Sequence, residues 1–257
     1  MTGFVAALSM YDWPEVRAET DAEWARLREA FRAAGIDAPE RLVRRNADLP
    51  PMPGGIRDVA GTVIAPDPAA LPPDELDFPT LWLHPNLLFA QTCWGPMELG
   101  LSKYVQVIGQ PSYDAFEGGQ GEFYSSAIVM RKGDGAPVSA PIDSRSLIPL
   151  DLIRDKRLGY NSDDSMSGII ALTRDLEALG ESLAIFSERI ETGGHRNSIV
   201  AVAEGRADVC AIDCRSWDLA KRFEPAAQHV QVVGWTGRRK GLPYIASLTA
   251  PAVSLPI

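Results

Sequence analysis

The sequence predicts an α/β protein with an open sheet whose strands are largely parallel. Short apolar runs alternate with helical patterns along most of the chain, and this order is typical of parallel sheets covered by helices. The chain has 257 residues, of which 46% are hydrophobic and 23% charged, so it can bury a full core. Extended passages at 107–125 and 231–246 divide it into an outer and a middle part. We therefore expect one lobe from 1–110 and 240–257, and a second lobe from 111–239.

In the outer lobe, strands and helices follow one another from the first residues. The expected elements are strands over 3–11, 41–45, 87–93 and 104–113 and helices over 14–34 and 95–101. Pro14 favours the start of the first helix and Gly35 its end, because proline fits the first helical turn and glycine the residue after the last. The segment 49–78 is rich in Pro, Gly and Asp, which favours either a surface excursion or a lid.

The middle lobe shows the strand-then-helix order most clearly. The expected elements are strands over 122–131, 157–160, 184–190, 207–212 and 230–235 and helices over 168–179, 196–205 and 217–223. A glycine-rich turn at 118–121 precedes the first of these strands. The carboxyl ends of parallel strands meet at one edge of a sheet, where open α/β proteins bind their ligands. A binding site is therefore expected among the residues that follow these strands.

Two turns between a strand and a helix carry the strongest functional signal. Ser165 and Ser167 stand at the start of one expected helix, and His195 follows Gly193 and Gly194 at the start of the next. The free N–H groups and the positive dipole end of a helix start attract anions. Two such helix starts facing one another would make a site for a small anion.

Each of these residues also fits a structural role. Ser165 and Ser167 fit as helix N-caps, which contribute about 1 kcal/mol and do not prevent contact with a ligand. His195 fits an ordinary surface loop. Asp213 ends an apolar strand, so it lies either at the binding edge, where it would accept hydrogen bonds from the ligand, or at the cap of the next helix.

Charge and composition argue against several kinds of partner. The net charge of −9 makes nucleic acid and anionic membranes poor general partners. No run of 18 apolar residues is present, so no membrane-spanning helix is expected. The first residues lack the basic region of a signal peptide, which places the chain as written in the cytoplasm, or in the periplasm if a leader is missing.

No cofactor or metal site is expected. The glycine run at 118–121 lacks the lysine and hydroxyl residue of a phosphate-binding P-loop. Only three cysteines and three histidines are present, without the spacing of zinc ligands. Cys93, Cys210 and Cys214 are therefore expected to be free thiols.

Four stretches, taken in their order along the chain, resemble the phosphonate/phosphate/phosphite-binding proteins of ABC transporters. They are AQTCWGP at 90–96, the run at 107–134, RLGYNSDDSMSG at 157–168 and GGHRNSIVAVAEGRADVCAID at 193–213. The similarity covers about residues 85–248. The resemblance implies a type II periplasmic-binding-protein fold, with open mixed sheets in two lobes that close over a small anion in the cleft between them.

The resemblance also implies which residues contact the ligand. They are Tyr11, Trp94, Tyr113, Ser125, Ser126, Ser165, Ser167, His195 and Asp213. The serines and His195 would hold the anionic group of the ligand. Asp213 and Tyr11 would recognise the rest of the ligand. Tyr113 and Trp94 would form walls. From the residues themselves, Tyr11 fits equally well as packing for the first helix, whereas Trp94 fits better as a core residue than as a wall of the site.

The predicted function is that of a solute-binding protein for a small anionic or zwitterionic, phosphonate- or phosphate-like ligand. An ABC-transporter permease is its implied partner, and no catalytic residue is assigned, because no order of residues fits a Ser-His-Asp triad. Two alternatives use the same fold. One is a cytosolic sensor that passes lobe closure to a protein partner, and the other is an enzyme that uses His195 or a cysteine, Cys93 or Cys214.

Overall fold

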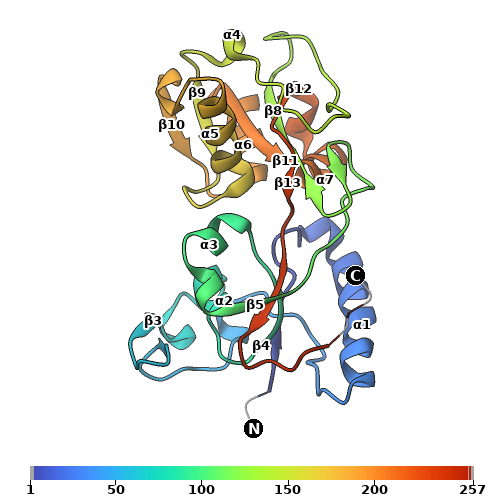
Figure 1. Ribbon diagram of the computed structural model, residues 1–257, viewed down its shortest axis with the longest axis vertical. Helices are drawn as coiled ribbons and strands as arrows, with labels where there is room; N and C mark the ends of the chain where they lie inside the picture. The colour runs from blue at the N-terminus through green and yellow to red at the C-terminus, as the bar shows by residue number, and fades with distance from the viewer. Residues whose placement is uncertain (1–2, 254, 256–257) are drawn as a thin grey trace. The chain divides into compact units, whose positions relative to one another are not determined.

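The computed structural model describes residues 3–253 and 255, and the chain folds into two compact units. Unit 1 runs to Pro111 and resumes at Leu242, whereas unit 2 is the continuous stretch Ser112–Gly241 (Figure 1). Each unit has its own sheet and buries its own apolar side chains. Each can therefore be stabilised by a hydrophobic core of its own.

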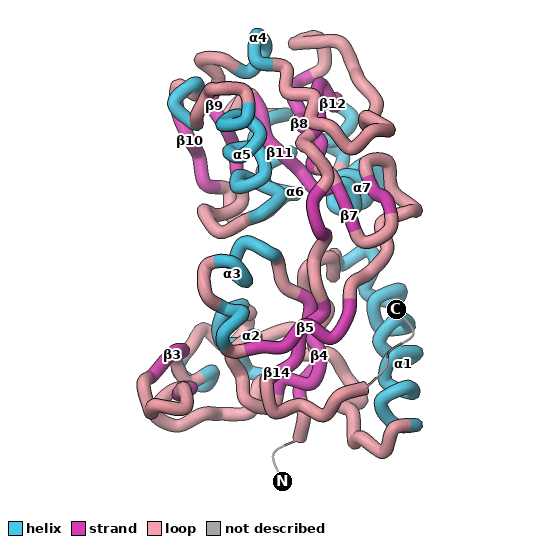
Figure 2. Tube along the Cα trace, viewed as in Figure 1, coloured by secondary structure: helices cyan, strands magenta, loops and turns pink. Residues whose placement is uncertain are grey.

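A four-stranded sheet in the order β1-β4-β14-β5 forms the centre of unit 1 (Figure 2). Its strands are β1 (Val5–Ala6), β4 (Leu87–Gln91), β5 (Val105–Gly109) and β14 (Tyr244–Ser247). β1 and β4 are parallel, and β14 runs antiparallel to both β4 and β5. All residues of β14 are buried, so the last strand of the chain lies inside this sheet.

Helix α1 (Arg17–Ala33) packs on the sheet of unit 1, after a 3-10 turn at Pro14–Val16. Its buried residues Trp24, Leu27 and Phe31 recur every three or four positions, as a helix with one apolar face requires. The rings of Trp24 and Phe89, a residue of β4, have centroids 5.8 Å apart. The helix ends before Gly35, whose φ of +80° is a conformation that favours glycine. The prediction of a helix over 14–34 is confirmed.

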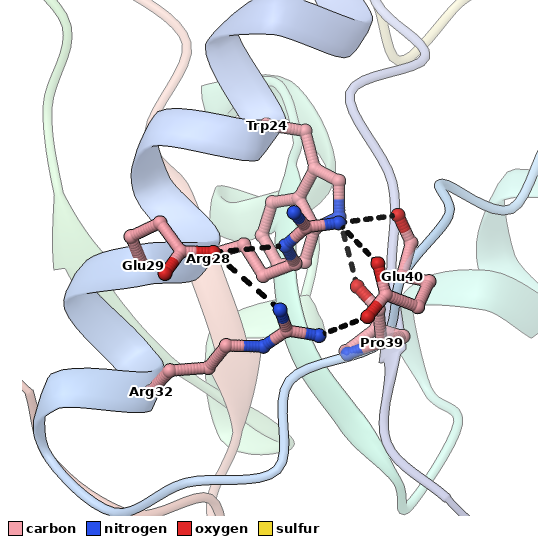
Figure 3. A network of polar contacts seen from close by, with 6 residues as sticks. All are labelled: Trp24, Arg28, Glu29, Arg32, Pro39 and Glu40. Carbon is pink, nitrogen blue, oxygen red and sulfur yellow. Dashed lines mark hydrogen bonds and ion pairs between the residues drawn. The ribbon is translucent and has the colours of Figure 1, made fainter.

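Polar contacts join the second half of α1 to the chain that follows it (Figure 3). The indole N–H of Trp24 donates to the carbonyl of Pro39 at 3.0 Å, and Arg28 donates to a carboxylate oxygen of Glu40 at 2.6 Å. Arg32 also pairs with Glu40. The Glu40 side chain is largely exposed, so solvent weakens its ion pairs, and burial of the indole ring dominates.

The remaining elements of unit 1 are short. They are 3-10 turns at Asn46–Asp48, Pro68–Ala70 and Leu101–Lys103, helices α2 (Phe78–Trp82) and α3 (Trp94–Glu98), and the paired strands β2 (Ile56–Arg57) and β3 (Val63–Ala65). The Pro-rich segment 49–78 is therefore mostly irregular, as its composition indicated.

Several strand predictions for unit 1 are wrong. The segment 41–45 is not a strand: Leu42 and Val43 are buried, but Val43 donates one backbone hydrogen bond to Ala6 at 2.8 Å without forming a ladder. The strands expected over 3–11 and 104–113 shrink to β1 and β5. The passage 231–246, interpreted as a linker, contains the start of β14. A buried loop and a buried strand give the same apolar pattern, so the pattern marks burial rather than pairing.

A five-stranded mixed sheet in the order β10-β9-β11-β8-β12 forms the centre of unit 2. Its strands are β8 (Ser126–Arg131), β9 (Arg157–Tyr160), β10 (Glu188–Glu191), β11 (Val209–Asp213) and β12 (Val230–Trp235). β10, β9 and β11 are parallel, whereas β8 is antiparallel to both β11 and β12. The sheet is therefore mixed, as the resemblance implied, and β9, β10 and β11 end at a common edge.

Four helices accompany this sheet. They are α4 (Leu150–Ile153), α5 (Ala171–Ala178), α6 (His195–Ala203) and α7 (Cys214–Phe223). A π-helical turn (Met166–Ile170) runs directly into α5, and Leu172 and Leu176 of α5 share a core cluster with Leu158 of β9 and Ala211 of β11 (Figure 1). α6 packs against β8, β9 and β11. Both helix starts named from the sequence therefore follow strands of this sheet.

Three boundaries in unit 2 differ from the predictions. The strand expected over 184–190 is a 3-10 turn (Leu183–Ile185) followed by β10, because this edge strand is largely exposed and gives no apolar signal. The strand expected over 122–131 is interrupted at Ser125, and β7 (Phe123–Tyr124) instead joins β6 (Gly119–Gln120) and β13 (Arg239–Lys240) in a small sheet. Helix α7 begins at Cys214, before the expected 217.

Candidate functional site

The candidate site lies at the carboxyl edge of the sheet of unit 2. β9 and β11 end there at Tyr160 and Asp213, and β8 begins there at Ser126. Ser126 is the register partner of Asp213, and paired residues project to the same face of a sheet. The two residues are 1% and 2% exposed. The sequence analysis predicted both residues as ligand contacts, but it did not predict that they are neighbours.

His195 joins three elements of the site. It begins α6, and its Nε2 atom lies 2.8 Å from the hydroxyl oxygen of Ser167 and 3.1 Å from a carboxylate oxygen of Asp213. The side chains of His195 and Asp213 are 11% and 3% exposed. A carboxylate only accepts hydrogen bonds, so Nε2 carries a ring proton and donates to Asp213. The structure thus brings Ser167, His195 and Asp213 together.

Asp213 caps a helix and also holds the histidine. One of its carboxylate oxygens accepts the backbone N–H groups of Arg215 at 3.0 Å and Ser216 at 2.9 Å, at the start of α7. Burial raises the pKa of Asp213, but the hydrogen bond and charge of His195 and the hydrogen bonds of Ser216 together outweigh this, so the pKa lies below its usual range. The group is a buried carboxylate at neutral pH, and capping, one of its two expected roles, is observed.

Ser165 caps the helical turn that precedes α5. Its hydroxyl oxygen accepts the N–H of Gly168 at 3.0 Å, and its carbonyl accepts the N–H of Ile170 at 3.1 Å, the wide spacing of a π turn. The cap uses a lone pair of the hydroxyl, so the O–H hydrogen can still be donated. Capping and ligand contact are therefore compatible at this residue.

Three polar atoms at this edge are buried without a hydrogen-bond partner in the part of the chain that the structure describes. They are the hydroxyl oxygen of Ser126, Nδ1 of His195 and the amide oxygen of Asn161. An unsatisfied buried polar group costs about 1–3 kcal/mol. Their gathering at one edge of the sheet favours a polar partner from outside the chain.

Asn161 is a residue of this edge that the sequence analysis missed. It directly follows β9, and its carbonyl accepts the N–H of Gly193 at 2.9 Å, close to the start of α6. A Cβ atom on Gly168 would lie 2.8 Å from the amide oxygen of Asn161 and 2.9 Å from the hydroxyl oxygen of Ser165. Glycine at 168 therefore lets the backbone pack directly against both polar groups, where a side chain would not fit. The signal that could have found Asn161 is its place after a strand and shortly before the serine turn.

Two further predicted contacts in unit 2 hold the backbone and the core. Ser125 is buried, and its carbonyl accepts the N–H of Cys214 at 3.2 Å, which ties β8 to the start of α7. Tyr113 is fully buried, with its ring centroid 5.2 Å from that of Tyr124 in β7. Tyr113 thus belongs to the core beside the small sheet.

Two predicted contacts belong to unit 1. Tyr11 follows β1 and is 3% exposed. Trp94 begins α3 and packs, half-buried, against the core cluster that contains Leu81 and Leu87. The packing role foreseen for Trp94 is therefore observed.

The cluster around His195 does not have the geometry of a catalytic triad. Ser167 and Asp213 contact the same ring nitrogen, whereas a triad histidine uses one nitrogen for the nucleophile and the other for the carboxylate. The three cysteines are free and buried. Burial raises the pKa of both Cys210 and Cys214 far above the usual range, and the charge of Asp213 adds to this at Cys214, which is the opposite of an activated thiol.

Within the described ranges, 3–253 and 255, no three His, Cys, Asp or Glu side chains gather in a way that could hold a metal ion. None of their helices has the length and apolarity that a bilayer span requires.

The two units with their mixed sheets have the type II periplasmic-binding-protein fold. The family model described as "ABC transporter, phosphonate, periplasmic substrate-binding protein" matches residues 99–253, more than half of the chain. The chain therefore belongs to the periplasmic phosphonate-binding proteins of ABC transporters, as the sequence resemblance implied. No curated protein sequence matches it.

Solved structures that are similar to this chain include two binding proteins. PhnD1 from Prochlorococcus marinus (MIT 9301), in complex with methylphosphonate, is 17% identical with a TM-score of 0.51, over 65% of this chain and 58% of that one. A binding protein component of an ABC phosphonate transporter from Pseudomonas aeruginosa is 11% identical with a TM-score of 0.55, over 98% of this chain and 70% of that one. The match thus spans less than two thirds of the length of PhnD1. At these identities the likeness establishes the fold alone.

Proposed function

We propose that this chain binds a small phosphorus oxyanion, a phosphonate or phosphate, at the carboxyl edge of the sheet of unit 2. The observation that carries the proposal is the set of buried polar atoms on Ser126, Asn161 and His195 that lack partners among the described residues. They lie beside the starts of two helical segments, at Ser165 and at His195. In this proposal Ser126, Ser165, Ser167 and His195 hold the anionic group.

The affinity of such a site comes from hydrogen bonds to charged oxygens. Each bond of this kind contributes about 1.5–3 kcal/mol. Helix starts add N–H groups without an intrahelical partner and a positive dipole end. These local donors outweigh the net charge of −9, because a surface charge is screened beyond about 8 Å whereas a buried site is not.

The cellular role follows from the family. Its members are periplasmic substrate-binding proteins of ABC transporters, so we propose that this chain acts in the periplasm and passes its ligand to a permease. We also propose that it binds the ligand without transforming it, since Ser167 and Asp213 compete for one nitrogen of His195. Ligand contact remains a prediction for four further residues: Tyr11, Trp94, Tyr113 and Ser125.

Titration calorimetry and thermal unfolding with methylphosphonate and phosphate test this proposal. Methylphosphonate is the first probe because it is the ligand in the PhnD1 complex. A ligand present at about one hundred times its Kd adds about 2.7 kcal/mol to the free energy of unfolding, which is visible as a raised Tm. If folded, ligand-free protein binds neither anion, the proposed function is wrong.

Two variants test the site itself. Ser126→Ala removes a hydroxyl that has no partner in the described chain, and Ser167→Ala removes the hydroxyl beside His195. Each should weaken methylphosphonate binding about tenfold or more, because one charge-assisted hydrogen bond is lost. Ser187→Ala, at an exposed serine of the same unit, is the matched control. If both site variants bind methylphosphonate with unchanged affinity, the ligand does not bind at this edge of the sheet.

A further inference from the structure

The sheet of unit 2 has an open edge at β10. Among the strands that the structure describes, β10 is the last on one side of this sheet and pairs with β9 alone (Figure 1). All but one of its four residues are exposed. An edge strand of this kind presents unpaired N–H and C=O groups, with which a further strand can pair.

The hydrogen bonds of β10 identify the backbone groups that point outward. Residues of a parallel strand face the neighbouring strand alternately. Thr192, directly after β10, donates its N–H to the carbonyl of Tyr160 in β9 at 2.8 Å, so every second residue before it also faces β9. Arg189 and Glu191 therefore direct their N–H groups away from β9, toward the open edge.

An open groove of about 800 Å³ lies beside this edge. It is lined by residues of β10, by Thr173 and Glu177 of α5, and by Tyr160 and residues of the turn at 182–187. The buried ring of Phe186 gives it an apolar part. A groove of this volume has room for several side chains of a bound segment.

The groove has an excess of negative charge. Three carboxylates, those of Asp163, Glu177 and Glu188, line it together with a single guanidinium, that of Arg189. None of the three carboxylates forms an ion pair with another residue of the described chain. A second copy of β10 would bring like charges to this edge, which disfavours pairing between copies. The charge instead favours a basic occupant.

We propose that the groove beside β10 binds an extended, Lys- or Arg-containing segment of another protein as an added strand. The outward N–H groups of Arg189 and Glu191 donate to carbonyls of the segment, and its basic side chains pair with Asp163, Glu177 and Glu188. In such strand additions the main chain supplies affinity and alternate side chains supply specificity. The inference goes beyond the proposed function and does not depend on it.

Fluorescence anisotropy with a short labelled peptide of alternating lysine and valine tests the inference. The protein should bind this peptide about tenfold or more tightly than the same peptide with glutamate in place of lysine. The double variant Glu177→Gln, Glu188→Gln should weaken binding of the lysine peptide about fivefold, because exposed ion pairs are individually weak. Asp151→Asn, at an exposed residue outside the groove, is the control and should leave the affinity unchanged.

Position 189 separates strand addition from attraction by charge alone. Arg189→Pro removes the outward N–H without removing a hydrogen bond to β9, and edge strands tolerate proline at such positions. This variant should weaken binding of the lysine peptide about tenfold, although it also removes a cation that repels the peptide. Arg189→Ala removes the same cation but keeps the N–H, so it should bind the peptide at least as tightly as the unaltered protein does.

Each outcome decides the inference without reference to the oxyanion site. The inference is wrong if folded protein does not bind the lysine peptide, or if it binds the glutamate peptide equally well. Equal binding by Arg189→Pro and Arg189→Ala also overturns it, because no strand is then added. If spermidine binds as tightly as the peptide, the groove takes a small cation and the inference is again wrong.

Circular dichroism shows whether each variant is folded. If Arg189→Pro prevents folding, Glu191→Pro with Glu191→Ala as its control replaces that pair, with the same expected loss. Methylphosphonate affinity, measured in parallel, should be the same in all these variants and the unaltered protein, because none of them changes a residue proposed to hold the anion. Failure to bind methylphosphonate therefore contradicts the proposed function alone, and failure to bind the lysine peptide contradicts this inference alone.

Discussion

Replacing Asp213 by asparagine should destabilise unit 2, because His195 loses its carboxylate partner. One carboxylate oxygen caps α7, and the other faces Nε2 of His195 at 3.1 Å. Asparagine keeps an oxygen for the cap but turns an N–H donor toward the Nε2 proton, so the contact survives only if that proton leaves. The charge-assisted hydrogen bond that is lost is worth about 1.5–3 kcal/mol. At about 2–4 °C per kcal/mol this lowers Tm by about 3–12 °C.

The effect of Asp213→Asn depends on pH with a definite sign. Burial raises the pKa of Asp213, but His195 and Ser216 lower it below its usual range. A carboxyl group whose pKa is lowered by folding stabilises the folded state above its unfolded pKa of about 3.9. This contribution is lost as the pH falls through the folded pKa, so the gap in Tm between the two proteins should narrow in acid.

Thermal unfolding followed by circular dichroism at pH 7 and below pH 4 measures this gap. Asp151→Asn, at an exposed residue of α4, is the control for the substitution itself. A variant with the Tm of the unaltered protein at pH 7 would refute the reasoning, and so would a gap that is the same at both pH values.

Two further predictions concern the space beside the site and the core of unit 1. Gly168→Ala should weaken methylphosphonate binding about tenfold, because its Cβ would lie 2.8 Å from the amide oxygen of Asn161; titration calorimetry measures this, and unchanged affinity would contradict it. Trp24→Ala should lower the free energy of unfolding by about 3–5 kcal/mol, because it empties a buried site against Phe31 and Phe89. Urea unfolding measures this loss, and a change below about 1 kcal/mol would contradict it.

The helix starts of the site could be predicted from the sequence because their signals are local. Ser165 and His195 each follow an apolar strand within a few residues, and small polar residues at such turns indicate a helix start. The pairing of Ser126 with Asp213 could not be predicted in this way. It depends on an antiparallel register between strands far apart in the chain, and nothing in either segment encodes the partner.

Asn161 and β10 show two other limits of the sequence. A polar residue after a strand fits any turn, so nothing local distinguishes Asn161, and the burial of its amide oxygen arises only when Gly168 and Ser165 fold against it. β10 reads ERIE, a largely exposed edge strand whose pairing with β9 comes from backbone hydrogen bonds. Its polar residues therefore resemble those of a loop.

The position of β14 has a consequence for the order in which the protein takes shape on the ribosome. β4 and β5 are translated long before β14, yet in the finished sheet they are not neighbours, because β14 lies between them. Unit 1 therefore cannot complete its ladder until Tyr244 and the residues after it have emerged. Unit 2 is continuous and can fold once Gly241 is available. The nascent chain should thus finish its inserted half first, against the usual N-to-C order, and a chain stopped before Leu242 should keep unit 2 alone.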